Sequence, residues 1–336
     1  LLTPKDNSPL LQVWVDQLDV GEVSSFIVSH FSGFERVVAW IDGLAVQGNA
    51  NNIHLFYDLD AGPGYGASLN ELSVNGFKGV PTLRNAQARV WGYTSGHVIQ
   101  AGGEDVYLQF PDLYASGWDL ASAQGIIKIW LGGGYLGVKG THIKTRVGDT
   151  VAAGSFAITR PQTVSEQRLS LQISADQTTV SQARTFVPDN IPVALDDWLQ
   201  TGLQAGRLFD AQYAYHGQIK VKPGELARRN ELTAGFSGLR VQYEPSWPAV
   251  YDATGSVYVA GSNVHIKLEQ GASESLQIRA AEVTLHNNAT YVSGNVDATG
   301  DATNMLSFVR SSPLQTNLAF ITPAWQASGR VDLTAA

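Results

Sequence analysis

The chain has 336 residues and a formal net charge of −8, and 44% of its residues are hydrophobic while only 15% are charged. This length allows a sizeable core, and the negative charge with scattered Lys and Arg residues argues against a nucleic-acid partner. The absence of cysteine excludes disulfides and thiolate metal sites. Thirty-four glycines beside many β-branched and aromatic residues are typical of short strands joined by tight turns, so we expect a mainly β fold.

Three helices are expected, because apolar residues recur every three to four positions over residues 19–31, 192–203 and 303–310. Asp19 and Glu22 have the spacing of a capping box at the start of the first helix. No window approaches 18 uninterrupted apolar residues, and the first residues lack the pattern of a signal peptide. We therefore expect a soluble segment of a longer protein.

Strict alternation of apolar and polar residues predicts many strands along the rest of the chain. His265, Lys267 and Glu269 occupy the polar positions of one such run, so each strand has an apolar face and a wet face. The alternating apolar residues are Ile53, Leu55, Tyr57 and Leu59; Leu169, Leu171 and Ile173; Val264, Ile266 and Leu268; Leu276 and Ile278; and Val283 and Leu285.

Two short patterns recur along the sequence. Residues 76–80 (GFKGV) resemble residues 235–239 (GFSGL). In the second pattern a proline is followed by Asn85-Ala86 and then by a valine-aromatic pair, and the same order recurs around Asp252-Ala253. Recurring sheet units favour a quasi-one-dimensional architecture. We expect one continuous elongated module with a first β segment over residues 1–180 and a second, repeat-like segment over residues 181–336.

No motif for catalysis or metal binding is present. The seven histidines are widely separated, and there is no GxSxG motif. Asp58 and Asp60 before Gly62 indicate a turn, because the other ligand positions of a calcium loop are not filled. We therefore expect no enzyme activity, no metal and no cofactor.

Five tryptophans could stack on sugars or simply pack in the sheet. They are Trp14, Trp40, Trp91, Trp118 and Trp130. Exposed tryptophans on the wet face would favour a polysaccharide-binding or adhesin-like sandwich or solenoid, and two acidic side chains converging in a cleft would favour a carbohydrate-active enzyme. Exposed aliphatic residues in one trough would instead favour a lipid ligand.

The most specific sequence pattern lies in the C-terminal half. It comprises Phe186-Val187-Pro188, Ile191-Pro192, Trp198-Leu199, Gly202-Leu203, Ala205-Gly206-Arg207 and Tyr215-His216-Gly217. This order of an extended segment, a helix and a strand resembles YhdP-type proteins of the AsmA-like superfamily, to which TamB-type proteins also belong. The similarity covers most of residues 165–336 and extends to residues 1–164 only in style, and its motifs carry no catalytic residue.

The resemblance implies a protein of the Gram-negative periplasm whose full-length form is anchored in the inner membrane by an N-terminal helix outside these residues. It implies a long, curled antiparallel β-sheet that forms an open apolar groove. Such proteins are thought to carry phospholipids between the inner and outer membranes and to support the outer-membrane barrier.

An apolar groove has a physical rationale, because burial of an acyl chain stabilises it by about 0.8 kcal/mol per CH₂. A chain of about 16 carbons would therefore lose on the order of 13 kcal/mol in water. We expect the alternating apolar residues given above, except Leu59, to line the groove, although the same alternation is typical of an ordinary sandwich core.

Overall fold

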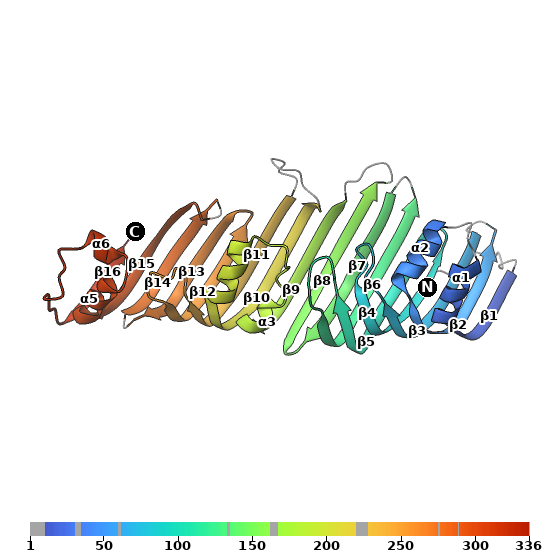
Figure 1. Ribbon diagram of the computed structural model, residues 1–336, viewed down its shortest axis with the longest axis horizontal. Coiled ribbons are helices and arrows are strands. Elements are labelled where there is room, and N and C mark those ends of the chain that lie inside the picture. The colour runs from blue at the N-terminus through green and yellow to red at the C-terminus, as the bar shows by residue number, and fades with distance from the viewer. Residues whose placement is uncertain are drawn as a thin grey trace. The chain divides into compact units, whose positions relative to one another are not determined.

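The computed structural model describes residues 11–30, 35–59, 62–132, 135–161, 167–219, 228–274, 276–287 and 289–335. Within these residues, 16 strands follow one another in chain order across one open antiparallel sheet, accompanied by six short helices (Figure 1). The prediction of a mainly β fold with an open antiparallel sheet and few short helices is confirmed.

The strands are β1 (Leu11–Asp19), β2 (Gln47–Asp58), β3 (Gly62–Val74), β4 (Thr82–Tyr93), β5 (Gly96–Gln109), β6 (Trp118–Gly132), β7 (Tyr135–Val147), β8 (Thr150–Pro161), β9 (Arg168–Thr179), β10 (Leu203–Gln218), β11 (Arg228–Val241), β12 (Val250–Ala260), β13 (Asn263–Ser273), β14 (Leu276–His286), β15 (Tyr291–Asp301) and β16 (Arg330–Ala335). The helices are α1 (Val20–His30), α2 (Glu35–Leu44), α3 (Val180–Arg184), α4 (Val193–Thr201), α5 (Ala302–Arg310) and α6 (Leu314–Asn317).

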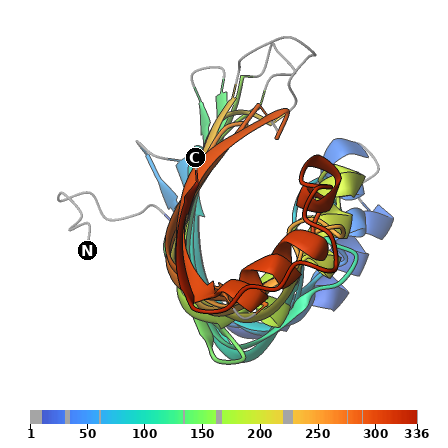
Figure 2. The same cartoon turned by 90° about the vertical axis from the view of Figure 1, so that its left-hand side faces the viewer.

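The chain forms two compact units. Unit 1 consists of Leu1–Ile173 with His216–Arg228, and unit 2 consists of Ser174–Tyr215 with Arg229–Ala336. In each unit the strands bend so that the sheet curls, and the helices of that unit lie on the concave side (Figure 2).

Bulges inside the strands account for the curl. Several non-glycine residues within strands have positive φ angles, and most of them lie where the pairing register shifts. A bulge adds one residue to a strand, bends that strand and increases its twist. These residues are Asn52, Glu71, Asn85, Asp105 and His142 in unit 1, and Asp210 and Asp252 in unit 2.

One predicted repeat corresponds to an equivalent bulge in each unit. Asn85 on β4 and Asp252 on β12 have φ angles of 57° and 52°, and the alanines that follow them are 3% and 2% exposed. The amide Nδ2 of Asn85 donates to the carbonyl oxygens of Glu104 and Asp105 at 3.3 and 3.2 Å on the adjacent strand. Short polar side chains tolerate positive φ better than β-branched ones, which explains why Asn and Asp occupy these positions.

The other recurring pattern is not structurally equivalent. Residues 76–80 lie between β3 and β4, where Phe77 and Val80 form an isolated bridge, whereas residues 235–239 lie inside β11. The two segments share a glycine with positive φ, Gly79 and Gly238. The sequence match therefore reflects a shared backbone turn and not a shared strand.

The bulge at Asp252 gives a stability prediction with an internal control. Asp252→Val should make unfolding easier than Asp252→Gly by about 1–2 kcal/mol, because positive φ is costly for a β-branched residue. At Ser256, an exposed position of the same strand without positive φ, the order should reverse because glycine weakens a strand. Urea unfolding of the four variants measures both differences, and equal effects at the two positions would contradict the role of the bulge.

Each unit has its own small core on one face of the sheet. In unit 1, Ala86, Val106 and Leu120 are buried together, with Trp118 and other partly buried residues packed around them. In unit 2, Phe236 and Leu239 are buried against Ala253 and against Val180 of α3. The contact with Val180 identifies this face of unit 2 as the one that carries the helices.

The three predicted helices form as α1, α4 and α5. The backbone N–H of Glu22 donates to the Asp19 carboxylate at 2.9 Å, which confirms Asp19 as the cap of α1. Phe31, at the end of the first predicted segment, lies outside the described residues. Asp301 caps α5, and the N–H of Thr303 that donates to its carboxylate at 2.8 Å lowers the pKa of Asp301.

Candidate functional site

Unit 2 carries an aliphatic surface made of three cross-strand rows. Residues directly opposite one another in neighbouring strands point to the same face, so the pairing register defines each row. No residue in the three rows is charged. From β11 to β15 the rows are Leu232, Val259, Val264, Leu285 and Val292; Ala234, Val257, Ile266, Val283 and Gly294; and Phe236, Gly255, Leu268, Ala281 and Val296. We call these rows the aliphatic face of unit 2.

The aliphatic face of unit 2 lies on the concave side. Val257, Ile266 and Leu268 pack against the cluster that contains Val180 of α3, and the helices lie within the curl (Figure 2). Apart from Phe236, which is 4% exposed in the cluster with Val180, its larger side chains are half-buried or exposed, since the described residues include no second sheet to cover them. The face is therefore not the core of a sandwich, which would be fully buried.

The structure places all the groove residues predicted on β13 and β14 on this face. Val264, Ile266, Leu268, Val283 and Leu285 belong to the three rows. Leu276 and Ile278 precede a register shift on β14. Ile278 pairs with Ala298, and Ala281 pairs with Val296. Val296 and Ala298 are two residues apart on β15 and so point to the same face. The parts of β14 before and after the register shift therefore present Ile278 and Ala281 to that same face.

In unit 1 the predicted residues on β2 also lie on the concave, apolar side. Leu55 is directly opposite Val13 and Tyr65, in a row that continues through Gly92 and His97 to Ile129. Ile53 is 8% exposed, whereas Leu55 and Tyr57 are each 45% exposed. The apolar surface of this unit is thus also accessible in part.

One polar pair interrupts the apolar surface of unit 1. The hydroxyl of Tyr65 and Nδ1 of His97 lie 3.1 Å apart, at hydrogen-bonding distance. Burial of the Tyr65 side chain raises the pKa of its hydroxyl, which stays protonated at neutral pH. The pair offers a hydrogen-bonding position inside an otherwise apolar row.

The predicted residues on β9 are not set apart from their neighbours by exposure. Leu169 and Leu171 are half-buried, as is Ser170 between them, and Ile173 is 42% exposed between two exposed neighbours. The hydroxyl of Ser170 lies 2.8 Å from Nδ1 of His216. Exposure along β9 therefore does not separate an apolar face from a polar one, and the groove-lining role of these residues stays a prediction.

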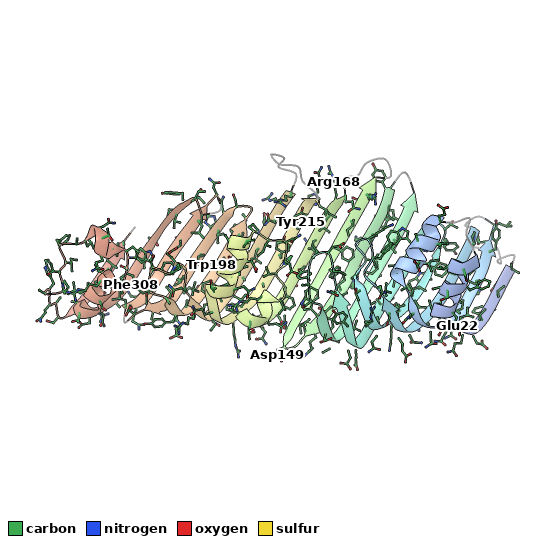
Figure 3. The ribbon with its side chains drawn as sticks, in the orientation of Figure 1. Glu22, Asp149, Arg168, Trp198, Tyr215 and Phe308 are labelled. Carbon is green, nitrogen blue, oxygen red and sulfur yellow. The ribbon has the colours of Figure 1, made fainter. Side chains whose placement is uncertain are left out.

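Aromatic side chains gather where α4 and α5 meet the loop before β12. Figure 3 labels Trp198 on α4 and Phe308 on α5. The Nε1–H of Trp198 donates to the Tyr243 carbonyl at 3.3 Å. The Trp247 ring centroid lies 6.2 Å from that of Tyr243 and 6.1 Å from that of Phe308. Burial raises the pKa of the Tyr243 hydroxyl to about 12, so it carries no charge at neutral pH. This cluster fixes both helices beside the aliphatic face.

The opposite face of unit 2 is polar, as the alternation predicted. His265 and Lys267 are exposed there, and Nδ1 of His265 lies 3.0 Å from the Thr284 hydroxyl. The guanidinium of Arg279 on β14 forms ion pairs with Asp297 on β15 and Asp332 on β16. The two faces of unit 2 therefore differ in chemistry: one is made of uncharged, apolar rows, and the other carries charged and polar side chains.

The five tryptophans considered for sugar stacking fall into three environments. Trp118 packs beside the core of unit 1, and Trp40 lies on α2 with its ring 5.4 Å from that of Phe77. Trp14, Trp91 and Trp130 are 67%, 43% and 37% exposed, on the face opposite to the core of unit 1.

Sequence reasoning found five of the fifteen positions of the aliphatic face of unit 2, all of them on β13 and β14. Among the larger side chains it missed Leu232, Val257, Val259, Phe236, Val292 and Val296, although Val257 and Val259 also alternate with polar or exposed neighbours. The periodicity of β12 was a usable signal, while the isolated apolar residues of β11 and β15 join the face only through the pairing register.

Neither a metal-ligand cluster nor a membrane-spanning helix occurs among the described residues. No three His, Asp or Glu side chains in this part of the chain lie close enough to hold a metal ion. Among the helices that the structure describes, none combines the length and apolar character needed to span a membrane. Asp60 of the considered calcium loop lies outside the described residues, while Asp58 ends β2.

Comparison with known proteins identifies the family. The family model described as YhdP protein matches residues 3–335, nearly the whole chain. No curated protein and no solved structure matched. Because the match spans both units, it extends the resemblance seen in the C-terminal half to the N-terminal half. The chain belongs to the YhdP protein family.

Proposed function

We propose that the concave apolar surface of this protein shields the acyl chains of phospholipids as they pass between the inner and outer membranes. The observation that carries the proposal is the aliphatic face of unit 2, where three uncharged rows cross five strands and most of the larger side chains stay partly exposed. Large exposed apolar surfaces on proteins mark binding sites for apolar partners. An acyl chain bound on this face would cover the apolar side chains that the sheet and the helices leave exposed to water.

Membership of the YhdP family supports the assignment to the Gram-negative envelope. In this proposal the protein works in the periplasm, with an inner-membrane anchor in its full-length form, and supports the outer-membrane barrier. Each buried CH₂ contributes about 0.8 kcal/mol, so a continuous apolar surface lowers the barrier to lipid movement without a chemical step. The proposed role therefore needs no enzyme activity and no cofactor.

The proposed lipid contacts are the half-buried residues of the three rows, together with residues of β9 and β2. On β9 they are Leu169, Leu171 and Ile173, and on β2 they are Ile53, Leu55 and Tyr57. Their shared property is an apolar side chain on a strand of the sheet. The Tyr65 and His97 pair could accept a hydrogen bond from a lipid head group or donate one to it.

The direct test is lipid extraction from protein that has been purified without detergent, followed by mass spectrometry. We expect co-purified phospholipid, and we expect the stripped protein to take up a fluorescent phosphatidylethanolamine from vesicles. Far-ultraviolet circular dichroism shows whether the protein remains folded. Folded protein that carries no lipid and takes up none would overturn the proposal.

A further inference from the structure

The wet face of unit 1 carries a row in which aromatic residues and glycines alternate from strand to strand. Each member is directly opposite the next in the pairing register, from β2 to β7. The row is Phe56, Gly64, Tyr93, Gly96, Trp130 and Gly137. We call it the aromatic strip. It is independent of the aliphatic residues, which point to the other side of the sheet.

Two of these rings cover the glycine of the next strand. The Phe56 ring fills the space that a Cβ on Gly64 would need, and the Trp130 indole does the same over Gly137. Phe56 and Tyr93 are in edge contact, with ring centroids 5.5 Å apart. Trp130 is 37% exposed, so part of its indole is open to a stacking partner.

Further aromatic side chains widen the strip. Trp91 on β4 and Trp14 on β1 lie on the same face one row away and are 43% and 67% exposed. Trp14 stacks on His54 at 3.8 Å, and His54 contacts Phe56 at 5.0 Å. An aromatic ring can have the structural role of covering the exposed backbone of a glycine, which explains the rings over Gly64 and Gly137. This role does not explain why Trp91 and Trp14 are also aromatic.

Two lysines beside the strip indicate the charge of the ligand. Lys128 on β6 and Lys139 on β7 are directly opposite each other and exposed, two residues along their strands from Trp130 and Gly137. Like charges in this position repel each other. In the part of the chain that the structure describes, neither lysine forms an ion pair with a carboxylate. A bound anionic group would relieve the repulsion.

We propose that the aromatic strip with Lys128 and Lys139 binds a linear acidic glycan. Pyranose rings pack their apolar C–H faces on aromatic π faces, and their hydroxyl and acidic groups need polar partners at the sides. The strip offers both, since the exposed pair Arg89 and Gln100 flanks it in addition to the lysines. Anionic vesicles and nucleic acid would meet the same lysines, so both are included as alternatives in the test.

Affinity electrophoresis and intrinsic tryptophan fluorescence of the whole chain test this proposal. The probes are oligogalacturonate as the acidic glycan, a neutral maltooligosaccharide of matched length, vesicles containing phosphatidylglycerol, and single-stranded DNA. We expect binding of oligogalacturonate and clearly weaker binding of the neutral oligomer. Trp130→Ala should weaken glycan binding roughly tenfold through loss of the stacked ring.

The lysine variants separate charge from stacking. Lys128→Gln with Lys139→Gln should remove the preference for the acidic oligomer, while Lys144→Gln, an exposed lysine elsewhere on β7 and on the same face, should leave it unchanged. Because Trp130→Ala uncovers Gly137, Trp130→Leu serves as a second variant that keeps apolar cover but removes the π face. Circular dichroism verifies the fold of each variant.

The proposal is overturned if folded wild-type protein binds neither glycan. It is also overturned if vesicles or DNA bind as tightly as oligogalacturonate while the Trp130 variants bind oligogalacturonate with wild-type affinity. That pattern would mean a surface that binds any anion. The lipid content of the Trp130 variants should equal that of the wild type, so this outcome can be told apart from failure of the proposed lipid function.

Discussion

Replacing Ile266 with Asp is expected to reduce the phospholipid that co-purifies with the protein by at least about tenfold. Ile266 lies at the centre of the aliphatic face, directly opposite Val257 on β12 and Val283 on β14. A carboxylate there would have to lose water wherever an acyl chain covers it, at a cost of roughly 2 kcal/mol or more. Since about 1.4 kcal/mol corresponds to a factor of ten in affinity, this one charge should lower the amount of bound phospholipid at least tenfold.

His265→Asp is the matched control for this variant. It places the same carboxylate one residue away on β13, on the exposed polar face, and removes the contacts of His265 with the Thr284 hydroxyl and the Tyr258 ring. Mass spectrometry of extracted lipid should show wild-type amounts for His265→Asp and a loss for Ile266→Asp. Equal lipid contents in the two folded variants would mean that the aliphatic face is not the lipid site.

Phe236→Ala should reduce the free energy of unfolding of unit 2 by about 3–5 kcal/mol. The Phe236 side chain is 4% exposed and forms the centre of a cluster with Val180, Leu239 and Ala253. Its removal leaves a cavity on the concave side and takes away the packing that holds α3. The helix has only five residues, so it depends on contacts outside itself: the Phe236 cluster and the hydrogen bonds that the Arg184 guanidinium donates to the Leu199 and Leu203 carbonyls.

Urea unfolding followed by fluorescence measures the overall loss, and hydrogen exchange of residues 180–184 reports on α3. Tyr291→Ala is the comparison, because it truncates an aromatic residue that is 63% exposed in the same unit and should change stability by less than about 0.5 kcal/mol. Similar losses for the two variants, or protection of α3 that survives Phe236→Ala, would show that the cluster does not anchor this helix.

Strand faces could be predicted from the sequence because a period of two is a local property. On β13 the alternation of Val264, Ile266 and Leu268 with polar residues was sufficient to separate the two faces. The three predicted helices likewise had a local signal, and α1 begins at the predicted cap. Family resemblance in the C-terminal half added an expected architecture that periodicity alone does not provide.

Other features depend on contacts that the sequence does not display. The helix α3 is too short for a recognisable period, and its cap, in which the Gln182 N–H donates to the Thr179 hydroxyl at 3.1 Å, resembles any Thr in a strand-rich chain. The helix α2 was missed because its apolar residues are adjacent as well as spaced. The aromatic strip emerges only when six strands are aligned in register, since its members are distant in sequence.

The order of the strands has a consequence for how this chain acquires its structure. Each strand pairs with the strands next to it in sequence, and most of these pairs are joined by short connections, while the longer connections before β2, β10 and β16 contain the helices. The entropy lost in closing the short connections is small, and low contact order favours rapid formation. Assembly can therefore begin at any hairpin and proceed one strand at a time, as in repeat proteins, without waiting for distant segments to meet.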